Sequence, residues 1–75
     1  MPTLRDFGSF QIRMYFKDHN PPHVHVVSPG ETVLVRIADG AVIRGEIDAA
    51  VLRQARAWVA ENKDELLVRW AEFQK

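Results

Sequence analysis

Apolar and polar residues alternate along much of the first half of the chain, which is the pattern of half-buried strands. The alternation is clearest over Phe10–Phe16 and again over Thr32–Ala38. Between these segments, His23–Val27 is rich in β-branched residues, which favour strands. A short strand at Thr3–Asp6 and a return strand at Ala41–Arg44 complete the series. The pattern predicts an antiparallel meander of three to five short strands.

Glycine-containing turns separate these predicted strands. Phe7-Gly8-Ser9 and Pro29-Gly30 lie where the chain must reverse its direction. Asp39-Gly40 is typical of a two-residue hairpin, because glycine accepts the positive φ that such a turn needs. Gly45 is expected to end the return strand.

The second half of the chain has the period of an amphipathic helix. Asp48 is a suitable N-cap, and Ile47 before it can pack on Leu52 inside the helix. One apolar stripe follows at helical spacing. It consists of Leu52, Ala55, Trp58 and Val59.

A second helix is predicted to begin near Asn62, because Asn62 and Glu65 have the form of an N-terminal cap. Apolar residues then continue at Leu66, Leu67, Trp70 and Phe73. Two helices, or one helix bent sharply near Asn62, fit this pattern. A single straight helix over Asp48–Phe73 is the alternative, since the apolar phase nearly survives the break. We therefore expect a small α+β domain over residues 1–75, with a β-meander followed by two C-terminal helices packed on one face.

Length and charge narrow the classes of function. The 75 residues contain no cysteine, which excludes a disulfide. No apolar run approaches the roughly 20 residues of a membrane span, and the N-terminus lacks the apolar core of a secretion signal. A cytoplasmic protein is therefore predicted. Ten basic and ten acidic side chains cancel, so the net charge gives no indication of nucleic-acid binding.

Two histidines are predicted to share one side of the strand His23–Val27. If Val24 and Val26 face the core, His23 and His25 point together to the opposite face. Their Cβ atoms then lie roughly 6–7 Å apart. Two imidazoles so placed could bind one metal ion, a divalent transition metal such as zinc, or act as an acid and base pair.

The loop before this strand can bring further groups to the histidines. Pro21 and Pro22 each restrict the backbone, so the approach to His23 is stiff. At the far end of the loop, Asp18 could orient an imidazole and His19 could be a third metal ligand. In the alternative interpretation the prolines only form a rigid turn, and the histidines are ordinary polar residues of a solvent-facing strand.

Two arginines are further candidates for the same face. Alternation places Arg13 and Arg36 on the non-core sides of their strands, on the face that carries the histidines. Either guanidinium could then stabilise anionic charge during a reaction.

The loop and strand resemble a known signature. The run Asp18-His19-Asn20-Pro21-Pro22-His23-Val24-His25-Val26 is similar to that of a family of small bacterial proteins, domain of unknown function 4160. The opening Met1-Pro2-Thr3 and the closing Glu65-Leu66-Leu67 with Trp70 and Phe73 are also similar, so the resemblance spans nearly the whole chain.

The resemblance implies which positions belong to the signature and what kind of partner to expect. The implied signature positions are Asp18, Pro21, Pro22, His23 and His25. Asp18 stands where the family has glutamate, and His19 lies where the family is more variable. The family's genes occur in a two-gene arrangement similar to toxin–antitoxin modules, which implies a small partner protein encoded nearby.

Two hypotheses about function follow. In the first, the chain is a binding or regulatory component of such a module and contacts its partner protein through the rigid His-rich loop. Surplus apolar surface on the helix pair would also favour a partner protein or a homodimer. In the second, the chain is a small hydrolase that cleaves RNA or another phosphoester, with His23 and His25 as acid and base or as metal ligands.

Overall fold

The chain folds as five strands followed by two helices. The structure is a computed structural model and describes residues 3–74. Its elements are β1 (Thr3–Asp6), β2 (Gln11–Arg13), β3 (His23–Ser28), β4 (Glu31–Arg36), β5 (Val42–Glu46), α1 (Ala49–Glu61) and α2 (Lys63–Phe73). Each strand pairs antiparallel with the next, in the sheet order β1-β2-β3-β4-β5. The predicted α+β class and the order of meander and helices are confirmed.

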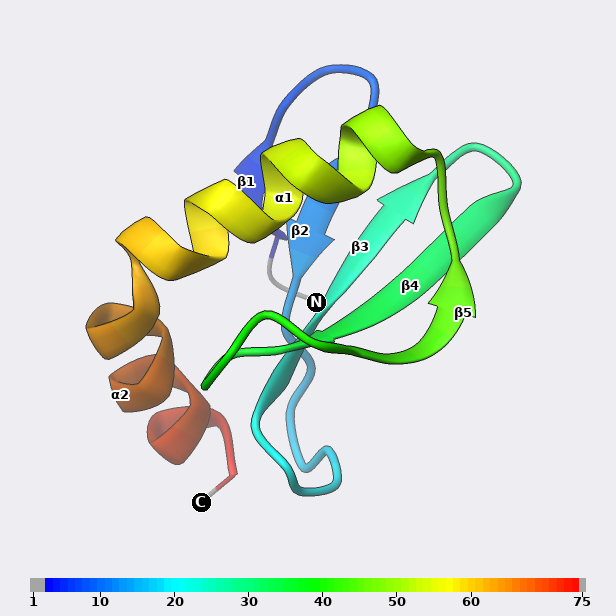
Figure 1. Ribbon diagram of the computed structural model, residues 1–75. Coiled ribbons are helices and arrows are strands. Elements are labelled where there is room, and N and C mark those ends of the chain that lie inside the picture. The colour runs from blue at the N-terminus through cyan, green and yellow to red at the C-terminus, as the bar shows by residue number, and fades with distance from the viewer. Residues whose placement is uncertain (1–2, 75) are drawn as a thin grey trace.

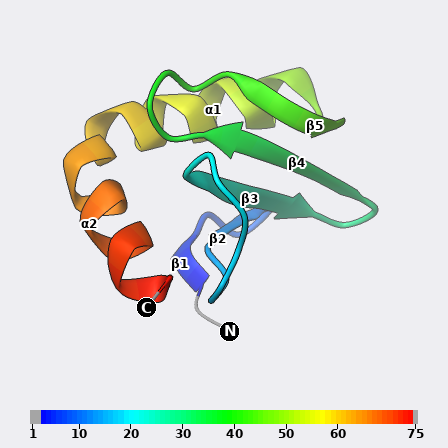
Figure 2. The same cartoon turned by 90° about the horizontal axis from the view of Figure 1, so that it is seen from below.

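One hydrophobic core lies between the sheet and the helices. α1 crosses one face of the sheet (Figure 1), and α2 turns from it to lie beside the strand ends (Figure 2). Alternate strand residues and one stripe of each helix fill the core, as their periodicities require. The buried members are Phe10, Ile12, Met14, Val24, Val26, Val33, Val35, Ile37, Ala55, Val59, Leu66 and Trp70. The opposite face of the sheet is therefore free to carry polar side chains.

The second half of the chain forms two helices, and the single straight helix is wrong. The Asp48 carboxylate accepts the backbone N–H groups of Ala50 and Val51, so the predicted N-cap of α1 is confirmed. Asn62 is the N-cap residue of α2, as predicted, but its side chain makes no capping hydrogen bond there, and its amide instead donates to the Trp58 carbonyl of α1. Neither of these helices is long and apolar enough to cross a membrane.

The second strand is shorter than its alternation predicts. β2 ends at Arg13, and although Met14 remains buried, the Phe16 side chain is 62% exposed. The chain leaves the sheet here because Phe16 stacks on Phe73 of α2, and the backbone N–H of Lys17 donates to the Phe73 carbonyl at 3.1 Å. This departure carries the following residues across the polar face of the sheet.

The turn between β4 and β5 is wider than a two-residue hairpin. The backbone N–H of Arg36 donates to the Ala41 carbonyl at 2.8 Å, which leaves residues 37–40 in the loop. The Asp39 carboxylate accepts the backbone N–H of Ala41 and pairs with the Arg36 guanidinium, and both contacts stabilise the wider loop. Gly45 does not end the return strand as predicted, because β5 continues through it to Glu46.

Candidate functional site

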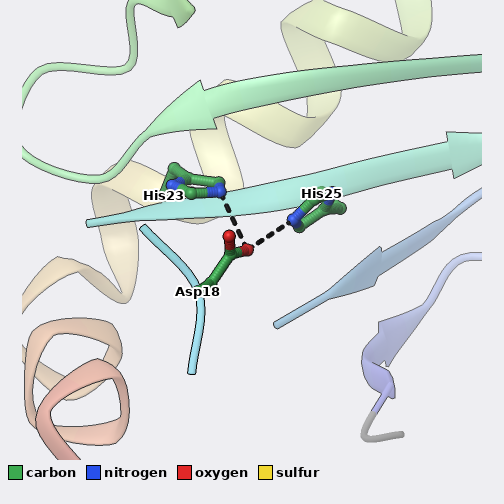
Figure 3. Close-up of side chains that lie close together, drawn as sticks. All are labelled: Asp18, His23 and His25. Carbon is green, nitrogen blue, oxygen red and sulfur yellow. Dashed lines mark hydrogen bonds and ion pairs between the residues drawn. The ribbon is translucent and has the colours of Figure 1, made fainter. Parts of the chain in front are cut away.

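Three side chains converge where the loop after β2 leads into the first residues of β3. The loop carries Asp18 back over the polar face of the sheet, beneath the side chains of His23 and His25 (Figure 3). Because Val24 and Val26 are buried in the core, the two histidines lie on the other side of β3, as predicted. Their ring centroids are 5.1 Å apart. The strand therefore supplies the two imidazoles, and the loop supplies a carboxylate between them.

One oxygen of Asp18 contacts both imidazoles. Its Oδ2 lies 3.1 Å from Nε2 of His23 and 2.9 Å from Nε2 of His25. The other oxygen, Oδ1, accepts the backbone N–H of His19 at 2.8 Å. The carboxylate is thus held from behind by the backbone and directed toward both rings. Asp18 therefore lies within contact distance of both imidazoles, where the predicted role in orienting an imidazole would place it.

The ring of His23 is held in one tautomer. Its Nδ1 lies 2.8 Å from the Pro21 carbonyl oxygen, which can only accept a hydrogen bond, so Nδ1 carries a proton. In the neutral ring, Nε2 then has a lone pair, and that lone pair faces the Asp18 carboxylate. His23 is only 4% exposed, and its Nε2 is a buried nitrogen with no hydrogen-bond partner. This atom requires a cation, either a proton or a metal ion, between it and Asp18.

Aromatic side chains pack against both imidazoles. The Trp70 ring of α2 lies 5.1 Å from that of His23, between centroids. Tyr15 meets His25 edge-on, with centroids 4.4 Å apart and an interplanar angle of 82°. Packing of this kind limits ring rotation, so both Nε2 atoms remain directed toward Asp18. Sequence periodicity placed Trp70 in the core, and the contact with His23 depends on how α2 turns at Asn62.

Asp18 is ionised at neutral pH. Burial, the largest single influence, raises the pKa of the Asp18 carboxyl. The hydrogen bonds from His25 and from the backbone N–H of His19, together with the charge of the two imidazoles, outweigh burial and hold this pKa below its ordinary value. A carboxylate that is ionised can only accept hydrogen bonds or bind a cation.

The lowered pKa of Asp18 predicts a loss of stability in acid. Because the folded-state pKa lies below the unfolded value of about 3.9, the contribution of Asp18 to the free energy of unfolding is complete above that value. It is lost as the pH falls through the lower, folded-state pKa. Urea unfolding between pH 3 and pH 7, without metal, should show a steeper fall below about pH 4 in the wild type than in Asp18→Asn. Equal slopes would contradict this assignment.

An open pocket lies beside the three side chains. It has a volume of about 490 Å³. Its walls are formed by Asp18, His19, Asn20, Pro21, His23, His25, Leu34, Ile43 and Arg44. The Asn20–Pro21 peptide bond in this wall is cis. His19 borders the pocket, but it is not among the mutually close metal-ligand atoms, so the structure does not bring it into the predicted set of three histidines.

The two predicted arginines have other partners. Arg13 lies opposite His25 in the sheet, but its guanidinium donates to the Gln11 side chain at 2.6 and 3.0 Å. Arg36 lies opposite His23, and its guanidinium pairs with Asp39 at 2.7 Å. Neither lines the pocket. The arginine at the pocket is Arg44, which sequence reasoning missed because the bulged pairing of β4 with β5 decides its position.

The cluster has the dimensions of a metal site. The ligand atoms of Asp18, His23 and His25 all lie within 4.8 Å of one another. With zinc–ligand bonds of roughly 2.0–2.2 Å, neighbouring ligands around a tetrahedral ion are about 3.3 Å apart. The two distances from Asp18 Oδ2 are close to this value. The proton on Nδ1 of His23 also leaves Nε2 as the metal-binding atom, with a backbone carbonyl as the outer partner that ligating histidines usually have.

Comparison with known proteins identifies a family. No curated protein and no solved structure matches the chain. The model of one protein family matches residues 9–71, which include the whole loop, β3 and most of both helices. That match covers Asp18, His23 and His25 together with the aromatic residues packed on them. The chain belongs to the family described as Domain of unknown function (DUF4160).

Proposed function

We propose that this chain holds one divalent transition-metal ion between Asp18, His23 and His25, and that it is a metal-dependent hydrolase. Zinc is the ion that this donor set favours, since two imidazole nitrogens and one carboxylate oxygen are among its common ligands. The observation that carries the proposal is the buried Nε2 of His23, which has no hydrogen-bond partner and faces an ionised carboxylate.

A metal ion accounts for more of the geometry than a protonated histidine does. An imidazolium at His23 would also satisfy Nε2, as a largely buried ion pair with Asp18 at 3.1 Å. A metal ion would instead bind Nε2 of the neutral ring, whose tautomer the Pro21 carbonyl already selects. At His25, whose Nε2 hydrogen-bonds to the same carboxylate oxygen, the ion would take the place of the proton on that nitrogen.

The number of ligands favours catalysis over a purely structural metal. Structural zinc sites usually have four protein ligands, whereas catalytic sites have three and leave a position for water or substrate. Three residues of the described chain converge here, and an open pocket adjoins them. The bound ion would polarise a substrate oxygen and lower the pKa of water. The residues themselves would hold the ion and orient it toward the pocket.

Zinc titration tests the proposal directly. Calorimetry of the metal-free protein with zinc chloride should give one ion per chain, and NMR should show the ring signals of His23 and His25 shifting together while His19 does not shift. The zinc-loaded protein should then hydrolyse a chromogenic phosphate monoester, and a chelator should abolish this activity. Absence of stoichiometric zinc binding would contradict the proposed metal site. Zinc binding without any hydrolysis would contradict the proposed catalytic role.

A second function, partner binding, is favoured by a separate observation. Val42 and Ile43 are exposed apolar residues on the edge strand β5, and Ile43 also borders the pocket. This surface suits the expected role as a cytoplasmic regulatory component of a toxin–antitoxin-like pair, acting with a small partner protein encoded nearby or with a second copy of this chain. The test of this role is to coexpress the chain with the neighbouring gene product and to measure copurification, first for the wild type and then for Ile43→Lys. Copurification that Ile43→Lys leaves intact would contradict it.

A further inference from the structure

Arg44 lies in one cross-strand row with the candidate metal site. In the sheet register His25 of β3 is opposite Leu34 of β4, and Leu34 is opposite Arg44 of β5. Residues directly opposite one another in an antiparallel sheet point to the same face. Arg44 is therefore on the face that carries His25, two strand spacings or about 10 Å away along the backbone.

The Arg44 side chain has no protein partner in the described part of the chain. Over residues 3–74 it makes no ion pair and no hydrogen bond, whereas Arg36 is paired with Asp39 and Arg13 with Gln11. It nevertheless lines the same pocket as the three converging side chains. A cation that borders a pocket and is free of intramolecular contacts is available to a ligand.

The wall beside Arg44 is apolar. Leu34 lies between Arg44 and His25 in the row, and Ile43 precedes Arg44 at the pocket. The pocket thus combines the three possible metal ligands, one arginine and an apolar wall. A ligand that fits all three parts carries an anionic group near the two cations and an organic group that contacts the apolar wall.

We propose that Arg44 binds the phosphate group of a phosphate-ester ligand whose other phosphate oxygen faces the metal ion held by Asp18, His23 and His25. The inference rests on the proposed metal site and names the substrate class of that site. A guanidinium can donate two parallel hydrogen bonds to two oxygens of one phosphate, and a phosphate monoester, which has three terminal oxygens, still has one oxygen free for a metal ion. A planar carboxylate has only two oxygens to divide between the two cations.

Phenylphosphonate is the probe for this inference, because it has the charge and apolar group of an aryl phosphate ester but no ester bond to cleave. Binding to the zinc-loaded protein is measured by calorimetry, after zinc binding itself has been measured on the same sample. We expect Arg44→Gln to weaken phenylphosphonate binding by about 10- to 100-fold, the loss expected for a charge-assisted hydrogen-bond pair. Zinc affinity should stay within about twofold, since Arg44 is outside the ligand set.

Four results decide the outcome. Arg36→Gln is the matched control on the same face of the sheet, and it should bind phenylphosphonate as the wild type does. If Arg44→Gln binds zinc and its affinity for phenylphosphonate equals that of the wild type, this inference is overturned but the proposed metal site is not. Absence of zinc binding would overturn the proposed function as well. Benzoate binding as tight as that of phenylphosphonate would overturn the assignment of a phosphate ester. Arg44 is exposed, so circular dichroism should show the same fold in the variant.

Discussion

Replacing His23 with alanine is expected to abolish stoichiometric zinc binding, with a loss in affinity of about 100-fold or more. Loss of an outer partner of a metal ligand alone costs about 10- to 100-fold in affinity, and removing a ligand should cost at least as much. His23 is also the ligand whose tautomer is fixed in advance by the Pro21 carbonyl. The measurement is calorimetric titration of the metal-free variant with zinc.

His19→Ala is the matched control for this prediction. His19 borders the same pocket but lies outside the cluster of ligand atoms, so its removal should leave zinc affinity within about twofold of the wild type. Because His23 is buried against Trp70, His23→Ala could also disturb packing, and His25→Ala provides a second, more accessible ligand variant. Wild-type zinc affinity in both His23→Ala and His25→Ala, with the circular dichroism of both variants unchanged, would contradict the metal site.

Replacing Gly45 with alanine is expected to cost about 3 kcal/mol of stability or to prevent folding. Gly45 has φ of +88°, a conformation that costs a residue with a side chain about 1–3 kcal/mol. It also lies against β4, where an added Cβ would collide with the carbonyl oxygen of Thr32 and crowd the backbone of Val33. A domain of this size has a free energy of unfolding of roughly 3–5 kcal/mol, so most of it would be lost.

Gly30→Ala separates the two expected causes of instability in Gly45→Ala, the positive φ and the collision with Thr32. Gly30 also has a positive φ, +81°, but no atom lies within 4 Å of the position of its added Cβ. This control therefore keeps the backbone strain, about 1 kcal/mol, without the collision. Urea unfolding of the two variants and the wild type gives the comparison. Equal losses of free energy in Gly30→Ala and Gly45→Ala would show that the close approach to Thr32 has no effect on stability.

The candidate site could be predicted in part because some of its features are local. Alternation along β3 is enough to place His23 and His25 on one face, since successive side chains in a strand must point to opposite sides. The position of Asp18 under both rings depends on the loop, and that loop departs from β2 where Phe16 and Lys17 contact Phe73 of α2. No pattern within the loop contains that contact, which spans most of the chain.

The arginines also show that a local sequence pattern does not determine the contacts of a side chain. Alternation correctly assigns Arg13 and Arg36 to the polar face, yet each guanidinium is held by a nearby side chain. Arg44 reaches the pocket through pairing across two strands, including a shift of register between Leu34 and Val35. A shift of one residue exchanges the two faces of a strand, so a short bulged strand gives a weak indication of which residues share a surface.

The sequence by itself determined the meander followed by helical segments, the core faces of β3 and β4 and the pairing of the two histidines, because these depend on periodicities of two or about 3.6 residues. It also determined the cap at Asp48, which depends only on the four successive residues from Asp48 to Val51. Only the tertiary structure decided that Asp18 faces both imidazoles, that Trp70 covers His23, and that Arg44 is the cation at the pocket. These contacts depend on where distant segments pack against one another, and local side-chain patterns do not contain that information.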